Sequence, residues 1–198
     1  MPMSKLLRRR QVVSQLLEER GDMMVVAGLG APAWDVTAAG DHDLNFPMWG
    51  AMGGAAMIGL GLALAQPKKK VLVVTGDGEM LMGLGALATI AVQQPRNLYI
   101  VVLDNERYGE TGMQETHTGH GVDLAGMAKA AGFAQALNVT TPAGVARLQD
   151  MIRTGAGPLL AQVKIDAEKL PLVLPPRDGA YLKNRFRAAL LGSEAVHQ

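Results

Sequence analysis

Two polar residues that can bind a metal ion each follow an apolar run of the sequence. Asp77, within Gly76-Asp77-Gly78, comes directly after the run at residues 71–75, and Asn105 follows the run at residues 98–103. If both runs are parallel strands, the Asp77 carboxylate and the Asn105 amide lie at the same edge of a sheet. Such oxygens are ligands of Mg²⁺, and a diphosphate can supply further ones. The flanking glycines leave room for phosphate near the start of the next helix, where anions are favoured.

The elements that must position these residues alternate along the chain. We expect strands at residues 23–27, 71–75, 98–103 and 159–165, and helices at residues 4–20, 48–65, 79–94, 123–131, 142–153 and 178–191. A loop at residues 28–32, which includes Gly30 and Ala31, follows the first strand, and Thr141 is the N-cap of a helix that starts at Pro142. This order predicts a single domain of the α/β class, an open parallel sheet with helices on both faces.

Composition excludes several other classes of function. Lys plus Arg (19) nearly balances Asp plus Glu (18), which gives no electrostatic case for nucleic acid or an anionic membrane. The absence of cysteine excludes disulfides, thiolate zinc sites and cysteine-ligated iron–sulfur clusters. The apolar stretch at residues 48–65 is rich in glycine, so we interpret it as a core helix and not a membrane span. The charged N-terminus does not resemble a signal peptide, which predicts a cytoplasmic protein. We interpret the basic cluster Lys5, Arg8, Arg9 and Arg10 as a solvated helix face.

Three motifs together resemble those of the thiamine-diphosphate enzymes. They are Trp49-Gly50-Ala51-Met52-Gly53, Gly76-Asp77-Gly78, and the segment from Asp104-Asn105 to Gln114. Their order and spacing resemble the diphosphate-binding domain of that family, as a stand-alone subunit, over almost the whole chain. The resemblance extends to the beta subunits of sulfopyruvate decarboxylases and to phosphonopyruvate decarboxylases. It implies the thiamine-diphosphate-binding fold and two cofactors, thiamine diphosphate and Mg²⁺.

The resemblance also implies roles for individual residues around the diphosphate. Asp77, Asn105 and the backbone carbonyl of Arg107 would bind Mg²⁺. Residues 108–114 would close over the diphosphate, and the residues that contribute there are Tyr108, Gly109, Glu110 and Thr111. The cofactor-binding residues would further include Gly30, Ala31, Gly76, Gly78 and Glu79. Glu79 differs from the small hydroxyl residue common in the family, so we expect only its backbone to help and its side chain to turn away from the phosphates.

Two more residues would act on the reactive part of the cofactor. Met52 resembles the bulky residue that bends the cofactor, and the carbonyl of Gly50 would accept a hydrogen bond from its 4′-amino group. This arrangement preorganises the proton removal from which decarboxylation of a 2-oxoacid starts. His117 lies just past the closing loop, where it could contact an anionic substituent of the substrate. Simpler interpretations stay open: Asp77 as a helix cap, Met52 as core and His117 as a surface residue.

One part of the family's catalytic site has no counterpart in this sequence. Members of the family use a glutamate on a separate pyrimidine-binding domain, and no glutamate here lies in a motif that resembles that domain. We therefore expect an alpha subunit to supply it, in a hetero-oligomer built from pairs of unlike subunits. The resemblance suggests a small 2-oxoacid substrate with a second anionic group. Alternatives are an acetolactate-synthase-like carboligase, an oxidoreductase subunit, or a non-catalytic cofactor-binding interaction subunit. A nicotinamide-binding domain is disfavoured because Gly28-Leu29-Gly30 lacks a third glycine at the required spacing.

Overall fold

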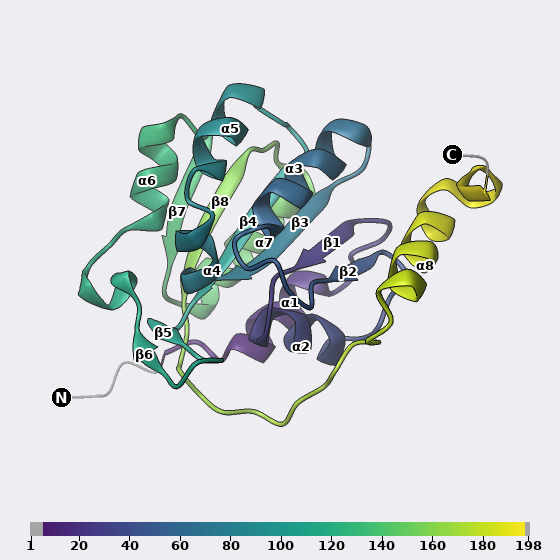
Figure 1. Ribbon diagram of the computed structural model, residues 1–198. Coiled ribbons are helices and arrows are strands. Elements are labelled where there is room, and N and C mark those ends of the chain that lie inside the picture. Colours follow the sequence, from purple (N-terminus) through teal and green to yellow (C-terminus); the bar gives the residue numbers. More distant parts are fainter. Residues whose placement is uncertain (1–5, 197–198) are drawn as a thin grey trace.

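Six parallel strands form the central sheet of the computed structural model, which describes residues 6–196 (Figure 1). They are β1 (Met24–Ala27), β2 (Asn45–Pro47), β3 (Val71–Gly76), β4 (Leu98–Asp104), β7 (Gln135–Val139) and β8 (Leu159–Lys164). Their order in the sheet is β2-β1-β3-β4-β8-β7. A separate antiparallel hairpin pairs β5 (Arg107–Tyr108) with β6 (Gln114–Glu115).

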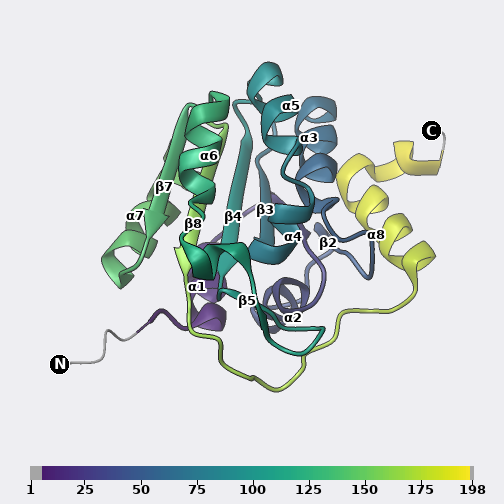
Figure 2. The ribbon, with the colours of Figure 1, turned by 60° about the vertical axis from the view of Figure 1, so that its left-hand side comes forward.

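Helices cover both faces of this sheet (Figures 1 and 2). They are α1 (Arg9–Leu17), α2 (Ala31–Ala38), α3 (Ala55–Ala65), α4 (Asp77–Met82), α5 (Ala86–Gln93), α6 (Leu124–Ala131), α7 (Pro142–Thr154) and α8 (Gly179–Leu191), with short 3₁₀ helices at His117–His120 and Gly192–Val196. One apolar core lies between the sheet and α1, α2 and α7, and a second lies between the opposite face and α3, α5, α6 and α8. Alternate strand residues enter the two cores, as Val25 and Val26 do. The predicted α/β class is confirmed.

The order of the strands in the sheet has a switch point between β1 and β3: β2 lies on the outer side of β1, whereas β4 lies on the outer side of β3. The connection after β1 runs through α2 on one face, whereas the connection after β3 runs through α4 and α5 on the other. The loops that leave the carboxyl ends of β1 and β3 therefore diverge, and this leaves a crevice where ligands bind in open α/β sheets. The predicted phosphate and metal residues follow these ends and that of β4.

Several predicted elements have different bounds in the structure. The helix expected at residues 48–65 begins only at Ala55, because Ala51 and Gly53 adopt left-handed backbone conformations with φ of 54° and 92°. The helix expected at residues 79–94 begins at Asp77 and is divided into α4 and α5, with Gly83 as the C-cap of α4.

The first helix and first loop also differ. The helix expected at residues 4–20 is limited to α1, because Leu7 is in a parallel bridge with Ile165; residues 4 and 5 lie outside the described part. Ala31, expected in a loop, is instead the first residue of α2, and neither α2, β2 nor β7 was predicted. The predicted N-cap is confirmed, since the Thr141 side chain accepts a hydrogen bond from the Gly144 amide at 3.1 Å.

A long connection runs from β8 to α8 past the carboxyl edge of the sheet (Figures 1 and 2). It is anchored at Trp49, whose indole nitrogen donates to the Pro176 carbonyl at 2.8 Å. At its far end α8 is held near β2 by the edge-to-face contact of Phe46 with Phe186, whose ring centroids are 5.6 Å apart. No helix among residues 6–196 is long and apolar enough to cross a membrane.

Candidate cofactor site

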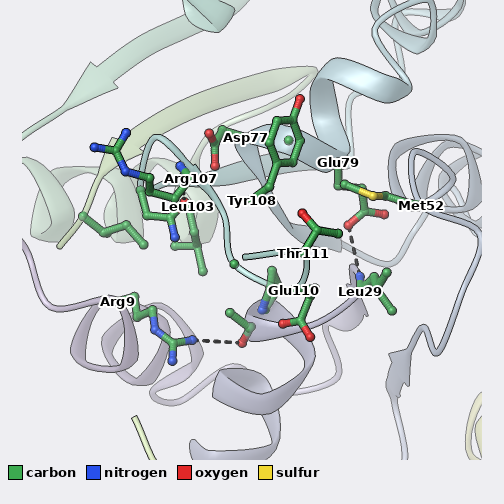
Figure 3. Close-up of a pocket in the computed structure, with 17 residues that line it drawn as sticks. Arg9, Leu29, Met52, Asp77, Glu79, Leu103, Arg107, Tyr108, Glu110 and Thr111 are labelled. Carbon is green, nitrogen blue, oxygen red and sulfur yellow. Dashed lines mark hydrogen bonds between the residues drawn. The ribbon is translucent and has the colours of Figure 1, made fainter. Parts of the chain in front are cut away.

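A pocket opens at the carboxyl edge of the sheet, where β1, β3 and β4 end (Figure 3). Six parts of the chain meet there: α1, the segment from Leu29 to the start of α2, Met52 ahead of α3, the β3–α4 junction, the end of β4 with the segment after it, and Ile165 after β8. The lining residues are Arg9, Leu29, Ala31, Pro32, Met52, Gly76, Asp77, Gly78, Glu79, Leu103, Asn105, Arg107, Tyr108, Gly109, Glu110, Thr111 and Ile165.

Most of the residues expected around the cofactor are brought together in this lining. Three are not. Gly30 adjoins the lining residues Leu29 and Ala31 but is not one of them, and Gly50 is exposed two residues from Met52. His117 is exposed on its 3₁₀ helix, between the buried residues Thr116 and Thr118. The roles of all these residues stay predictions, since no ligand is present.

The two predicted metal ligands that would bind through their side chains, Asp77 and Asn105, stand at the ends of neighbouring strands. β3 and β4 pair so that Gly76 is opposite Leu103, and Asp77 begins α4 directly after Gly76. Asn105 follows β4, and its Oδ1 accepts a hydrogen bond from the Arg107 amide at 3.0 Å. Asp77 and Asn105 thus line one pocket from the ends of adjacent strands, and their role as metal ligands stays a prediction.

Two threonines that the sequence analysis overlooked hold the Asp77 carboxylate. The hydroxyl of Thr116 donates to Oδ2 of Asp77, and the hydroxyl of Thr118 lies 3.1 Å from the same oxygen. Thr118 also lies 2.7 Å from Oδ1 of Asp104, so that one hydroxyl connects two buried carboxylates. Their only signal in the sequence was the spacing of two threonines two residues apart, Thr116 and Thr118.

Asp104 is held from its other side by β8. Its Oδ2 accepts hydrogen bonds from Gln162 at 2.5 Å and from Lys164 at 2.8 Å. Burial raises the pKa of Asp77, and the nearby Asp104 carboxylate raises it further, whereas the two threonine hydroxyls lower it. A cation bound at Asp77 would offset both unfavourable effects, because it stabilises the ionised carboxylate.

The side chain of Glu79 connects β1 to β3 at the floor of the pocket. Its Oε2 accepts hydrogen bonds from the Leu29 amide at 3.1 Å and from the Thr75 hydroxyl at 2.9 Å. The carboxyl group occupies the space beside Gly28, where a Cβ atom would lie 1.9 Å from Oε2. Burial raises the pKa of Glu79. This carboxyl group therefore serves local structure, and α4 can offer a phosphate only backbone donors near Glu79.

The ring of Tyr108 lies against the backbone at Gly78. A Cβ atom at Gly78 would be 2.5 Å from Cε1 of Tyr108, so only glycine allows this contact. The turn that follows is closed by amide hydrogen bonds from Thr111 and Met113 to the Tyr108 carbonyl, at 3.4 Å and 2.9 Å. The segment expected to close over a diphosphate thus forms one wall of the pocket.

Arg9 is a lining residue that differs from its expected role. It was interpreted as part of a solvated helix face, but only 5% of it is exposed. Its Nη1 donates to Oδ2 of Asp35 at 2.7 Å, and Nε of Arg10 donates to Oδ1 of the same carboxylate at 3.0 Å. The buried Asp35 on α2 therefore draws one face of α1 inward and places a cation at the pocket.

The donor set fits a metal that is shared with a phosphate group. Among the described residues, no cluster of three or more His, Cys, Asp or Glu side chains could hold a metal ion. Asp77 and Asn105 supply two side-chain oxygens, fewer than the octahedral shell that Mg²⁺ requires. The remaining ligands would have to come from the backbone, from water or from a bound diphosphate.

Comparisons with known proteins agree with this geometry. The family model of the thiamine pyrophosphate enzymes, C-terminal TPP binding domain, matches residues 29–163. A sulfopyruvate decarboxylase subunit beta from Methanococcus maripaludis is 33% identical over 190 residues, which are 93% of this chain and 98% of that protein. A phosphonopyruvate decarboxylase from Streptomyces viridochromogenes is 39% identical over 177 residues, 87% of this chain and 43% of that protein.

A solved structure shows the same fold. Benzoylformate decarboxylase from Polynucleobacter necessarius superposes with a TM-score of 0.67 at 23% identity, over 87% of this chain. The match covers 35% of that protein, so this chain corresponds to about a third of its length. The chain belongs to the thiamine pyrophosphate enzymes, and within them to the family of the sulfopyruvate decarboxylase beta subunits.

Proposed function

We propose that this chain binds thiamine diphosphate and Mg²⁺ as the beta subunit of a 2-oxoacid decarboxylase of the sulfopyruvate and phosphonopyruvate type. The observation that carries the proposal is the entry of Asp77 and Asn105 into one pocket from the ends of β3 and β4. The names of the relatives, sulfopyruvate decarboxylase subunit beta and phosphonopyruvate decarboxylase, support the substrate class.

In this proposal Asp77, Asn105 and the backbone carbonyl of Arg107 bind Mg²⁺. The hydroxyls of Thr116 and Thr118 keep Oδ2 of Asp77 in place. Backbone amides of Gly78 and Glu79, together with Tyr108, Gly109, Glu110 and Thr111, surround the diphosphate. Such preorganised donors bind phosphate without further rearrangement of the protein.

Bound thiamine diphosphate would supply a carbon nucleophile and accept the electrons that remain when CO₂ leaves. Met52 would keep the cofactor bent, and the Gly50 carbonyl would orient its amino group. Leu29, Leu103 and Ile165 give the pocket an apolar lining, which excludes water from the reacting atoms. Specific positioning and a dry pocket are what this chain contributes to catalysis.

The activating glutamate is proposed to come from an alpha subunit. Glu79 is bound to the Leu29 amide and to Thr75, so it serves local structure instead. Trp49 and Met52 support a partner near the pocket, because 41% and 37% of their surfaces are exposed. Large exposed apolar groups beside a site are typical of surfaces that another chain covers.

The decisive experiment is a decarboxylation assay of this chain with and without the product of the neighbouring reading frame. We expect CO₂ release from sulfopyruvate or phosphonopyruvate only when both chains, thiamine diphosphate and Mg²⁺ are present. Asp77→Ala should abolish it, whereas Asp150→Ala, at an exposed position on α7, should not. CO₂ release without the partner would contradict the proposal that the active site is shared between two chains. Formation of an acyloin product would favour the carboligase alternative. Cofactor binding without any activity would favour a non-catalytic interaction subunit.

A further inference from the structure

Arg9 is a buried cation on the side of the pocket away from Met52 (Figure 3). Its Nη1 donates both to Asp35, at 2.7 Å, and to the Ala31 carbonyl, at 3.5 Å. Among the described residues, both side-chain hydrogen bonds of Arg9 are donated by Nη1. The N–H groups of Nε and Nη2 are thus available to a ligand. Since Arg10 binds the same carboxylate, the group of two arginines and Asp35 carries a net positive charge.

The two lining arginines differ in how their side-chain donors are used: Arg9 binds its partners through Nη1 alone, whereas Arg107 uses both Nη1 and Nη2. The second one, Arg107, is bound through Nη1 to the Glu106 carbonyl at 2.9 Å and through Nη2 to the Glu115 carboxylate at 3.0 Å. The Ala31 carbonyl that Arg9 contacts belongs to a residue without a polar side chain. A polyanion in this part of the pocket would find free guanidinium donors on Arg9.

The carboxylate of Glu110 lies in the same part of the pocket as Arg9 (Figure 3). It packs on the backbone at Gly30, where a Cβ atom would be 2.7 Å from Oε1. Gly30 is the N-cap of α2, and it gives that helix no side-chain cap. Burial raises the pKa of Glu110, whereas the charge of Arg9 lowers it. An anion of the chain itself is therefore already packed at the positive end of the α2 dipole, where the charge of Arg9 also acts on it.

We infer that Arg9 binds the diphosphate of the cofactor, whose oxygens take the position that the Glu110 carboxylate occupies in the cofactor-free chain. The inference rests on the proposed function, which assigns a diphosphate to this pocket. Arg9 is then a cofactor-binding residue, Asp35 its positioning residue, and Glu110 an internal anion that must move aside. A guanidinium suits this role, because it binds phosphate oxygens through paired donors.

The test is a calorimetric titration of Mg²⁺-thiamine diphosphate and of Mg²⁺-pyrophosphate into the full chain, alone and with its partner. Arg9→Met should weaken the binding of both ligands by about 10- to 100-fold, the range for a hydrogen bond to a charged group. Arg10→Met is the matched control. It also removes a partner of Asp35, but the Arg10 side chain is not part of the pocket lining. Equal affinities of the two variants would overturn the inference.

A second variant keeps the test sound if Arg9→Met folds poorly. Glu110 is exposed, so Glu110→Gln should fold, and it should tighten pyrophosphate binding about 2- to 5-fold by removing the competing charge. Unchanged or weaker binding would overturn the inference that the diphosphate takes the position of the Glu110 carboxylate. If the wild-type chain binds neither ligand, alone or with the partner, the proposed function itself fails. Binding that is insensitive to Arg9 refutes only the role of Arg9.

Discussion

The hydroxyl of Thr118 lies 2.7 Å from Oδ1 of Asp104. The same hydroxyl is 3.1 Å from Oδ2 of Asp77, which follows a different strand. Because one hydroxyl has one proton, it can donate to only one carboxylate at a time, and Thr116 supplies a second donor to Asp77. The orientation of the proposed metal ligand thus depends on a segment that follows the closing loop.

Thr118→Val should weaken Mg²⁺ binding without unfolding the chain. Asp104 keeps Gln162 and Lys164, so we expect a loss of stability of about 1–2 kcal/mol. The Mg²⁺ concentration for half-maximal thiamine diphosphate binding should rise about 10-fold, as for other residues that orient metal ligands. Thr140→Val, at an exposed position, is the control. An unchanged Mg²⁺ requirement would show that Thr118 does not orient Asp77.

Gly78→Ala should destabilise the cofactor-free chain by about 1–3 kcal/mol, the usual cost of overpacking. The new methyl group would lie 2.5 Å from Cε1 of Tyr108, so the ring would have to leave its place. Gly76→Ala is a matched control, because a Cβ atom there would meet nothing within 4 Å. Urea unfolding of both variants measures the difference, and equal midpoints would mean that the Tyr108 contact is not maintained in solution.

Glu79→Ala should cost about 2–4 kcal/mol of unfolding free energy. It leaves the Leu29 amide and the buried Thr75 hydroxyl without their acceptor and opens a cavity beside Gly28. Glu79→Gln keeps an acceptor oxygen and the volume, and should cost less than about 1 kcal/mol. Chemical denaturation distinguishes the two variants. If they were equally unstable, the charge of Glu79 and not its hydrogen bonds would hold the two strand ends.

The sequence was sufficient for the main architecture and for the residues that follow β3 and β4. Continuous apolar runs identified the buried strands, and the Asp77 and Asn105 positions follow from where those runs end. The edge strand β7 was not predicted, because Gln135–Val139 is half exposed and lacks such a run. α2 was missed because its first residues, Ala31 and Pro32, were interpreted as a loop.

The supporting residues of the site could not be read from local patterns. Arginine is usually solvated, and burial of Arg9 depends on Asp35, which lies 26 residues away in the sequence. Thr118 contacts Asp77 across 41 residues. Neither Arg9 nor Thr118 lies in a distinctive motif, so these contacts appear only once the sheet brings the segments together.

His42 makes the stability of the chain sensitive to acid. Its Nδ1 accepts a hydrogen bond from the Leu44 amide at 3.0 Å, which requires that nitrogen to be unprotonated. Burial lowers the pKa of His42 below its usual 6.5; Arg20 and Arg185 act in the same direction, and Asp41 and Asp43 oppose it. Because the folded state binds this proton less well than the unfolded state, the stability that neutral His42 contributes is fully present above pH 6.5 and is lost as the pH falls toward the lower pKa.

His42→Asn can keep an acceptor near the Leu44 amide but does not titrate. We therefore expect the wild-type chain to lose more unfolding free energy than this variant between about pH 7 and 5 in urea titrations, in the direction set by linkage. Parallel pH profiles for the two proteins would show that His42 is protonated in the folded state as readily as in the unfolded one.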